Sequence, residues 1–338
     1  MASGRRVIIT GGTGLIGRAL AAELAAAGYE VVVLSRDPSR AGGLPSGVRA
    51  ERWDGRTPQG WGPLADGAYA IVNLAGENLA GGRWTAARKE RIRRSRLNAG
   101  RAVVEAVRAA ERKPAVVVQA SGIGYYGPHG DEEVTEDAPP GSDFLGRLAV
   151  EWEASTAPVE ALGVRRVVIR TGVVLSAEGG ALPRLVLPFR FFLGGPLGSG
   201  RQWTPWIHIA DEVGAIRFLV EHEEAWGPYN LAAPHPVTNR ELARALGRAL
   251  RRPAWLPVPA PALRLALGEM SAVLLTGQRA VPKRLLEAGF VFRFPAVGAA
   301  LRDLFSPVPQ TNSRNPKTDN RVLHSDQKGK PDVCRLIL

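Results

Sequence analysis

Short apolar runs alternate with longer helical patterns along the first half of the chain. The apolar runs lack the regular change from apolar to polar that marks a strand with one face in water. Strands that are covered by helices on both faces show this pattern, so the chain is expected to form a parallel sheet with crossover helices. The predicted strands are Arg6–Thr10, Glu30–Ser35, Val48–Trp53, Ala68–Leu74, Ala115–Ala120 and Arg165–Arg170.

The helical stretches place apolar residues on one face at a period of about 3.6 residues. The stretch Thr85–Glu111 is long, and an interruption within it is compatible with the pattern. Prolines, glycines and aromatic residues replace the regular pattern between Pro183 and Trp206, after which helical patterns return. The predicted helices are Leu15–Ala27, Thr85–Glu111, Phe144–Ala161, Ile209–His222, Asn239–Leu250, Ala260–Leu275 and Lys283–Ala288.

Together these elements predict an α/β protein: a Rossmann-type doubly wound parallel sheet with a small C-terminal lobe that covers the substrate. The dinucleotide-binding domain is expected at 5–175, with 203–235 contributing to it, and the lobe at 176–202 and 236–305. The remaining segment, 306–338, is rich in Asn, Ser, Pro, Lys and Asp. Such a composition buries too little apolar surface to offset the entropy of ordering, so a disordered tail is expected.

A glycine-rich turn joins the first predicted strand to the first predicted helix. Gly11 permits a tight turn, Gly14 lets the backbone approach a pyrophosphate, and Gly17 lets the helix pack closely on the strand. The helix N-terminus then offers unpaired N–H groups to the phosphates. This order of strand, turn and helix predicts a dinucleotide site, although the spacing is G-x-x-G-x-x-G. The residues assigned to it are Gly11, Thr13, Gly14, Leu15, Ile16 and Gly17.

Composition and charge narrow the class of protein. Arginine carries most of the formal net charge of +12, but it is spread along the chain without a nucleic-acid-binding motif, so nucleic acid is not an expected partner. No apolar run reaches the length of a membrane span, and Met1 is followed closely by a strand, so neither a membrane nor a signal peptide is expected. Cys334 is the only cysteine, which excludes a disulfide and fits a cytoplasmic protein.

Several further segments, read with the glycine turn, resemble the atypical extended short-chain dehydrogenase/reductases. More narrowly, they are similar to the YfcH-like "epimerase family" proteins, which join an NAD-dependent epimerase/dehydratase domain to a C-terminal domain of unknown function. The resemblance extends over about residues 5–305. The matching segments are 10–17 (TGGTGLIG), 73–78 (NLAGEN), 83–84 (RW), 95–96 (SR), 121–127 (SGIGYYG), 170–175 (RTGVVL), 194–200 (GGPLGSG), 206–209 (WIHI) and 277–282 (GQRAVP).

The end of the second predicted strand indicates which nicotinamide cofactor is bound. An acidic residue there binds the ribose 2′-hydroxyl of NAD, whereas an arginine accommodates the 2′-phosphate of NADP. The chain has Ser35 and Arg36 at this place, which favours NADP(H), with an ordinary exposed loop arginine as the alternative. The resemblance supports the phosphate interpretation. It also implies cofactor contacts from Leu74, Ala75, Gly76, Arg96 and Val174.

The expected acid/base pair is missing. Active members of the superfamily use a Ser or Thr together with Tyr-x-x-x-Lys on a helix, in which the tyrosine transfers a proton while hydride moves to or from the nicotinamide. Ser121 fits the first role, but Phe144 and Leu148 stand at the spacing of the tyrosine and lysine. Tyr125 and Tyr126 are the candidates to replace the acid. Aromatic packing under the nicotinamide is the alternative for both.

Two functional hypotheses therefore remain open. The resemblance implies NADP(H)-dependent redox chemistry or epimerisation of a small polar substrate, sugar- or nucleotide-linked by analogy. The second hypothesis is an NADP(H)-binding sensor or regulator without turnover, linked for example to division. Glu77 and His208 are further polar candidates, for which loop anchoring and structural hydrogen bonding are the preferred interpretations. No cluster has metal-ligand spacing, and the resemblance is compatible with a homodimer without indicating an interface.

Overall fold

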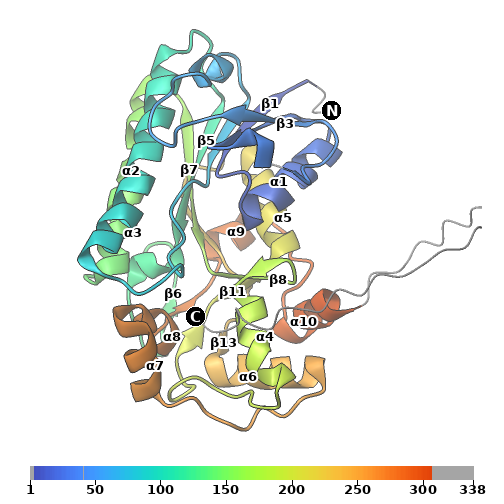
Figure 1. Cartoon of the computed structure of the whole chain (residues 1–338). Helices are drawn as coiled ribbons and strands as arrows, with labels where there is room; N and C mark the ends of the chain where they lie inside the picture. Colours follow the sequence, from blue (N-terminus) through green and yellow to red (C-terminus); the bar gives the residue numbers. More distant parts are fainter. Residues whose placement is uncertain (1–3, 41, 307–338) are drawn as a thin grey trace, which may run out of the picture. The chain divides into compact units, whose positions relative to one another are not determined.

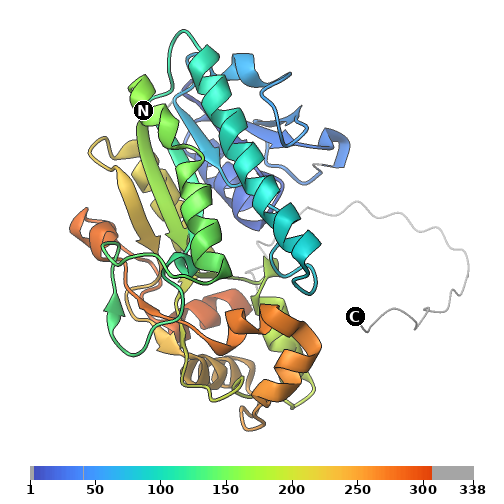
Figure 2. The ribbon, with the colours of Figure 1, turned by 90° about the vertical axis from the view of Figure 1, so that its left-hand side faces the viewer.

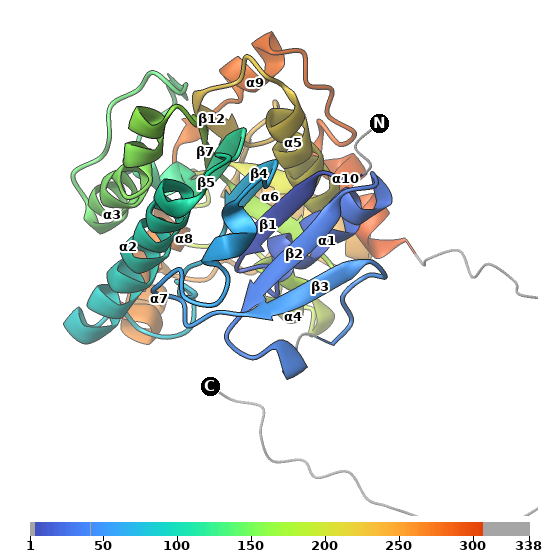
Figure 3. The same ribbon diagram turned by 90° about the horizontal axis from the view of Figure 1, so that it is seen from above.

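A seven-stranded parallel sheet forms the centre of the protein, in the order β12-β7-β5-β4-β1-β2-β3 (Figures 1 and 3). The computed structural model describes residues 4–40 and 42–306. The strand order reverses between β1 and β4, which is the topological switch point of a doubly wound sheet. The fold-class prediction is confirmed. The strands are β1 (Arg6–Thr10), β2 (Glu30–Ser35), β3 (Val48–Arg52), β4 (Ala70–Asn73), β5 (Val116–Gly122), β7 (Arg165–Thr171) and β12 (Gly227–Leu231).

Helices cover both faces of this sheet, as the apolar strand runs require. On β1, Val7 and Ile9 belong to one buried apolar cluster, whereas Ile8 belongs to the other. The first cluster lies under α1 (Leu15–Ala26) and α5 (Ile209–Glu221). The opposite face carries α2 (Ala86–Ala109), a single uninterrupted helix, and α3 (Phe144–Ala154). Both faces of the inner strands are therefore buried, which explains their lack of alternation in the sequence. Edge strand β3 differs, since its residues are only partly buried or exposed.

A second group of helices lies beyond the carboxyl ends of the strands (Figures 1 and 2). It has its own apolar core, which includes Trp206, Leu242 and Leu246. The predicted helix 260–275 is broken at Gly268, whose φ of +60° ends the first segment. The helices of this group are α4 (Leu182–Arg190), α6 (Asn239–Leu250), α7 (Ala260–Leu267), α8 (Ala272–Leu275) and α10 (Val297–Phe305), while α9 (Lys283–Glu287) packs beside β12.

Short strands connect the sheet to these helices. The strands are β8 (Val173–Ser176) with β9 (Gly179–Gly180) and β11 (Trp206–His208), β10 (Trp203–Thr204) with β13 (Val237–Thr238), and β6 (Glu133–Val134) with β14 (Arg279–Ala280). The residues expected to form a disordered tail lie outside the described residues except for Ser306. None of the helices in the described ranges combines the length and apolar character that crossing a membrane requires.

Candidate functional site

The glycine turn is packed tightly on the sheet and open on its outer side. Gly11 has a φ of +67°, and a Cβ there would lie 2.9 Å from the carbonyl carbon of Leu74. A Cβ on Gly17 would lie 2.5 Å from the Cα of Gly12, so α1 packs directly on the turn. Gly14 is exposed, and its Cβ would meet only a carbonyl oxygen at 3.2 Å. The turn therefore offers the open backbone cradle that a pyrophosphate needs.

A buried chain of side-chain hydrogen bonds joins three strands beside this turn. Thr10 Oγ1 donates to Asn73 Oδ1 at 2.6 Å, and Asn73 Nδ2 donates to Gln119 Oε1 at 2.8 Å. The Thr10 hydroxyl also accepts from the backbone N–H of Ala75 at 3.2 Å. The segment of Leu74 and Ala75 is therefore held at the end of β4, where the sequence analysis places cofactor contacts.

Ser35 and Arg36 follow the glycine turn around the same edge of the sheet. Ser35 ends β2, and its hydroxyl accepts from the backbone N–H of Asp37 at 3.2 Å. The Arg36 side chain is exposed and has no hydrogen bond or ion pair with any described residue. An unpaired guanidinium thus stands at the position that Rossmann folds use for the ribose 2′ substituent.

Arg96 is buried behind the end of β4. Its Nη1 donates to the carbonyl oxygens of Glu77 and Ile92, both at 3.1 Å, and its guanidinium lies 4.6 Å from the centre of the Trp152 ring. Burial lowers the pKa of Arg96 to about 10, so the group is charged at neutral pH. A Cβ on Gly76 would lie 3.0 Å from this guanidinium. Glycine at position 76 therefore lets the cation rest against the backbone.

Glu77 and His208 both have anchoring geometry. The backbone N–H of Glu77 donates to Ser95 Oγ at 2.9 Å, and its carboxylate lies 3.3 Å from Nη1 of Arg88. His208 is buried and caps α5, because its Nδ1 accepts from the N–H of Ala210 at 3.1 Å. Both residues thus make contacts of the kind that the preferred interpretations predict. Among the described residues, no group of His, Cys, Asp and Glu could hold a metal ion.

The β8–β9 hairpin reaches back from the C-terminal group to the glycine turn. Val174 lies in β8, paired with Ile207. A Cβ on Gly180 would lie 2.9 Å from a methyl group of Leu15 and 3.7 Å from the carbonyl oxygen of Val174. The structure therefore brings Val174 and Leu15, both predicted to contact the cofactor, close to the same glycine.

Ser121 belongs to a polar cluster at the ends of β5 and β7. Its hydroxyl donates to Glu153 Oε1 at 2.7 Å. Arg170, which pairs with Ser121 in the register of the two strands, donates to both oxygens of the same carboxylate, at 2.9 and 3.0 Å. Arg170 and Ser121 are both largely buried. Glu153 thus holds the serine and the arginine together through a forked, charge-assisted contact.

The hydroxyl of Tyr126 forms its hydrogen bonds inside the protein. It donates to Asn230 Oδ1 at 2.7 Å and accepts from Nη1 of Arg170 at 3.0 Å. The side chain is 2% exposed, and burial raises its pKa to about 12. This is the geometry of the packing alternative rather than that of a proton donor to a ligand.

Tyr125 differs from its neighbour. Its ring lies over the guanidinium of Arg170, with Cζ 3.4 Å from the ring centre, and the residue is partly exposed. Within the described part of the chain, its hydroxyl has no hydrogen-bond partner. Of the two candidate tyrosines, Tyr125 has the hydroxyl that is free for a ligand.

The positions expected for the usual tyrosine and lysine are apolar in structure as well as in sequence. Phe144 packs edge-on against Trp84, with ring centres 5.1 Å apart. Leu148 is buried in the same cluster, which also contains Ile92 and Met270. No titratable group reaches the site from these two places on α3.

A buried carboxyl that the sequence analysis missed lies below the end of β7. Glu212 is fully buried on α5 and accepts from Thr171 Oγ1 at 2.9 Å, while its other oxygen has no partner among the described residues. Burial raises its pKa to about 8. The sequence analysis also missed Glu153 and Asn230. A helical or turn pattern does not show which residues from distant parts of the sequence a side chain contacts.

Sheet order, glycine turn and the polar strand ends define a dinucleotide-binding protein of the short-chain dehydrogenase/reductase type. The chain belongs to the "NAD dependent epimerase/dehydratase family", whose model matches residues 7–232. A "Domain of unknown function (DUF1731)" matches residues 258–304. The predicted family is therefore confirmed, and it is a family that depends on a nicotinamide dinucleotide.

Individual relatives show the same assignment. The chain is 42% identical over 306 residues to the epimerase family protein SDR39U1 of Bos taurus, covering 89% of this chain and 100% of the relative. A crystal structure of human SDR39U1 with NADPH has a TM-score of 0.80 at 37% identity, with 88% and 98% of the two chains covered. A nucleoside-diphosphate sugar epimerase from Corynebacterium glutamicum has a TM-score of 0.72 at 34% identity, with 90% of this chain and 59% of that one covered.

Proposed function

We propose that this protein is an NADP(H)-dependent oxidoreductase or epimerase. The observation that carries the proposal is the unpaired guanidinium of Arg36 beside the open glycine turn. A phosphate on the ribose would meet this cation and the Ser35 hydroxyl, whereas the ribose of NAD(H) offers no charge there. The NADPH in the structure of human SDR39U1 supports this choice of cofactor.

The remaining cofactor contacts follow from the same edge of the sheet. The pyrophosphate would lie on the outer side of Gly14 at the N-terminus of α1, where the backbone is open. Leu74 and Ala75 are held at the end of β4 by the Thr10 hydroxyl and would support the adenosine. Val174 would approach the nicotinamide, which donates or accepts a hydride when bound.

Proton transfer is assigned to Tyr125, with Ser121 as a hydrogen-bonding partner of the substrate oxygen. The Tyr125 hydroxyl has no hydrogen-bond partner among the described residues, and its ring lies over the guanidinium of Arg170. Ser121 is fixed by Glu153 at the end of β5, where ligands of open α/β sheets approach. The substrate is proposed to be small, polar and sugar- or nucleotide-linked. The likeness to the nucleoside-diphosphate sugar epimerase of Corynebacterium glutamicum supports that class.

One observation favours a second candidate function. Because Phe144 and Leu148 are packed in an apolar cluster, the chain holds a cofactor site without the usual acid/base pair. A protein that binds NADP(H) and signals its redox state without turnover would have the same features.

The cofactor proposal is tested by titrating the Arg36→Ala variant with NADPH and with NADH. Loss of a charge-assisted contact is expected to weaken NADPH binding by about 1.5–3 kcal/mol, roughly tenfold to more than a hundredfold, and to leave NADH binding unchanged. Arg101→Ala, an exposed arginine on α2, is the control and should change neither affinity. An unchanged preference for NADPH in Arg36→Ala would rule out the proposed phosphate contact.

Turnover separates the enzyme from the sensor. Purified protein with NADPH and a panel of sugar-linked and other carbonyl compounds should show one of two reactions. Reduction of a carbonyl consumes NADPH and is followed by the loss of the absorbance of the reduced nicotinamide, whereas epimerisation leaves the cofactor concentration unchanged and is followed by analysis of the products. Tyr125→Phe should abolish this reaction while NADPH still binds, and Tyr126→Phe should retain it. Binding of NADPH without oxidation or epimerisation of any compound in the panel would favour the sensor.

A further inference from the structure

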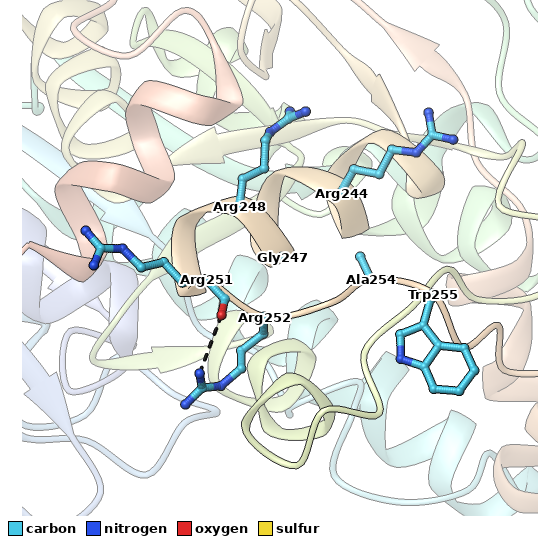
Figure 4. A pocket seen from close by; sticks show the side chains of 7 residues that line it. All are labelled: Arg244, Gly247, Arg248, Arg251, Arg252, Ala254 and Trp255. Atoms are coloured by element: carbon cyan, nitrogen blue, oxygen red, sulfur yellow. Dashed lines mark hydrogen bonds between the residues drawn. The ribbon is translucent and has the colours of Figure 1, made fainter.

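A group of arginines and exposed aromatic residues lies at the far end of the C-terminal helices, away from the dinucleotide site. It surrounds a shallow hollow of about 440 Å³ at the end of α6 (Figure 4). We refer to it as the arginine–aromatic patch. Its residues are Arg244, Arg248, Arg251, Arg252, Phe191, Phe192, Leu193 and Trp255.

The backbone of two separate segments creates this surface. Helix α6 ends at Arg251, which takes a left-handed conformation with φ of +53° and turns the chain sharply. The following segment runs beside the one after α4, because the N–H of Leu256 donates to the carbonyl oxygen of Gly194 at 3.1 Å. Arg252 then reaches across and lies 4.4 Å from the centre of the Phe192 ring. Phe192 and the arginine-lined hollow therefore form one continuous surface.

The positive charge of the patch is not balanced within the described part of the chain. No carboxylate lines the hollow, and none of its four arginines forms a salt bridge with a described residue. Elsewhere arginines are commonly paired, as Arg217 is with Glu23 and Glu221. Figure 4 shows the four guanidinium groups projecting in different directions rather than converging on one point. This arrangement fits an extended anionic surface better than a single small anion.

Large apolar side chains are exposed beside these cations. Phe191, Phe192 and Leu193 are consecutive residues, exposed at 66%, 53% and 52%, in the turn that follows α4. Trp255, across the hollow, is exposed at 66%. Isolated exposed apolar residues are common, but several together on one surface indicate an interaction site.

We propose that the arginine–aromatic patch binds the surface of an anionic lipid bilayer. The guanidinium groups would contact phosphates of the headgroups, while Phe191, Phe192 and Leu193 enter the boundary between headgroups and acyl chains, as interfacial anchors do. Three adjacent apolar residues, of which Leu193 is aliphatic, fit that boundary, whereas a nucleic acid offers Leu193 no stacking partner. The sequence predicts no membrane partner because it lacks a spanning segment, but interfacial binding needs none.

The test is flotation of the full-length protein with extruded vesicles at low and at physiological ionic strength. Vesicles of phosphatidylcholine with 40 mol% phosphatidylglycerol should bind the protein, and pure phosphatidylcholine vesicles should bind it much more weakly. Arg244→Gln/Arg248→Gln should reduce the partition coefficient by about tenfold or more, because each arginine near an anionic surface contributes on the order of 1 kcal/mol. Phe191→Ser/Phe192→Ser should reduce binding to both vesicle types.

Matched variants separate the patch from overall charge and folding. Arg101→Gln/Arg108→Gln removes two exposed arginines from α2, and Leu265→Ser removes an apolar side chain that is 80% exposed on α7. Both controls should bind vesicles as the wild type does, and all variants should bind NADPH normally. The proposal is overturned if the protein does not bind anionic vesicles, or if the control variants lose as much vesicle binding as the patch variants do. It is also overturned if vesicles do not bind and the patch variants instead lose binding to single-stranded oligonucleotides.

Discussion

The carboxyl edge of the sheet has two halves that treat their polar groups in opposite ways. At β1, β2 and β4 the glycine turn is open, and the Arg36 guanidinium has no partner in the described part of the chain. At β5 and β7, Ser121, Glu153, Arg170 and Tyr126 are bonded to one another. The first half leaves donors available to a ligand. In the second half, most donors form hydrogen bonds within the protein.

The residues proposed for cofactor binding and those proposed for chemistry therefore lie in separate halves of this edge. The groups proposed to meet phosphate have no partner among the described residues and are open to a ligand. At the reactive half, apolar residues replace the tyrosine and lysine, and the polar residues that remain stabilise the junction of β5, β7 and α3. Among the described residues of this half, Tyr125 keeps a hydroxyl without a hydrogen-bond partner. The comparison predicts that changes in the two halves affect different properties.

The largest effect is expected for Glu153→Ala. Removal of this carboxylate leaves Arg170 buried without its ion-pair partner, so the free energy of unfolding should fall by about 3–5 kcal/mol, measured by urea denaturation. The NADPH dissociation constant of the folded variant should change little. The control is Glu151→Ala, on the same helix as Glu153. It breaks a more exposed ion pair with Arg93 of α2 and should lower the free energy of unfolding by less than about 1 kcal/mol. A loss of NADPH affinity larger than the loss of stability would contradict the separation of the halves.

The next largest effect is a dependence of the free energy of unfolding on pH, caused by the Glu212 carboxyl. The folded protein holds the pKa of this carboxyl at about 8, above its value in the unfolded chain, so the unfolded state binds fewer protons between the two values. Stability should therefore fall as pH rises from about 5 to 8 and stay low above that. Glu212→Gln should remove the fall and be more stable than wild type at pH 9 by about 2–4 kcal/mol. Parallel stability profiles of the two proteins from pH 5 to 9 would show that the carboxyl does not ionise on unfolding.

A smaller change is expected from Gly17→Ala in the binding half. The added methyl group would lie 2.5 Å from the Cα of Gly12, so α1 has to move away from the turn at a cost of about 1–3 kcal/mol. NADPH affinity should fall at least tenfold in a fluorescence titration, because the phosphate cradle moves with the helix. Gly42→Ala is the control, since a Cβ there meets nothing within 4 Å. If both variants bind NADPH equally well, the turn does not form the phosphate site.

The smallest effect is expected from Tyr126→Phe. Loss of its hydroxyl removes hydrogen bonds to Asn230 and Arg170 and should lower the free energy of unfolding by about 1–2 kcal/mol. The pH dependence of any turnover should stay as in the wild type. A shifted or abolished pH profile would move Tyr126 from packing to catalysis.

Much of the fold could be predicted from local patterns. The boundaries of β1 and β2 agree with the predicted strands because both faces of these strands are apolar. Strand β12 was missed since Gly227 and Pro228 resemble a turn, yet proline is tolerated there because β12 lies at the edge of the sheet. Helix α4 was missed for a similar reason, since it contains Pro188. Predicted helix 144–161 ends earlier, at Ala154.

The site was predictable only where its parts are close in sequence. The glycine turn is one continuous segment, so its geometry could be read directly. The partner of Tyr126, by contrast, is Asn230, 104 residues away, and that of Ser121 is Glu153, 32 residues away. Periodicity indicates that these residues lie on helices or strands, but not which of them meet. The choice between Tyr125 and Tyr126 therefore required the structure.

The buried chain from Thr10 through Asn73 to Gln119 has a consequence for assembly of the sheet. Each of its side chains is hydrogen-bonded to a side chain of the neighbouring strand, and all three are shielded from water. A shift of β4 by one residue would place an apolar side chain between two buried amide or hydroxyl groups and leave them unsatisfied. Apolar strands alone would tolerate such slippage. These hydrogen bonds therefore fix the register of the three central strands, because misregistered pairings during folding would leave buried polar groups unsatisfied.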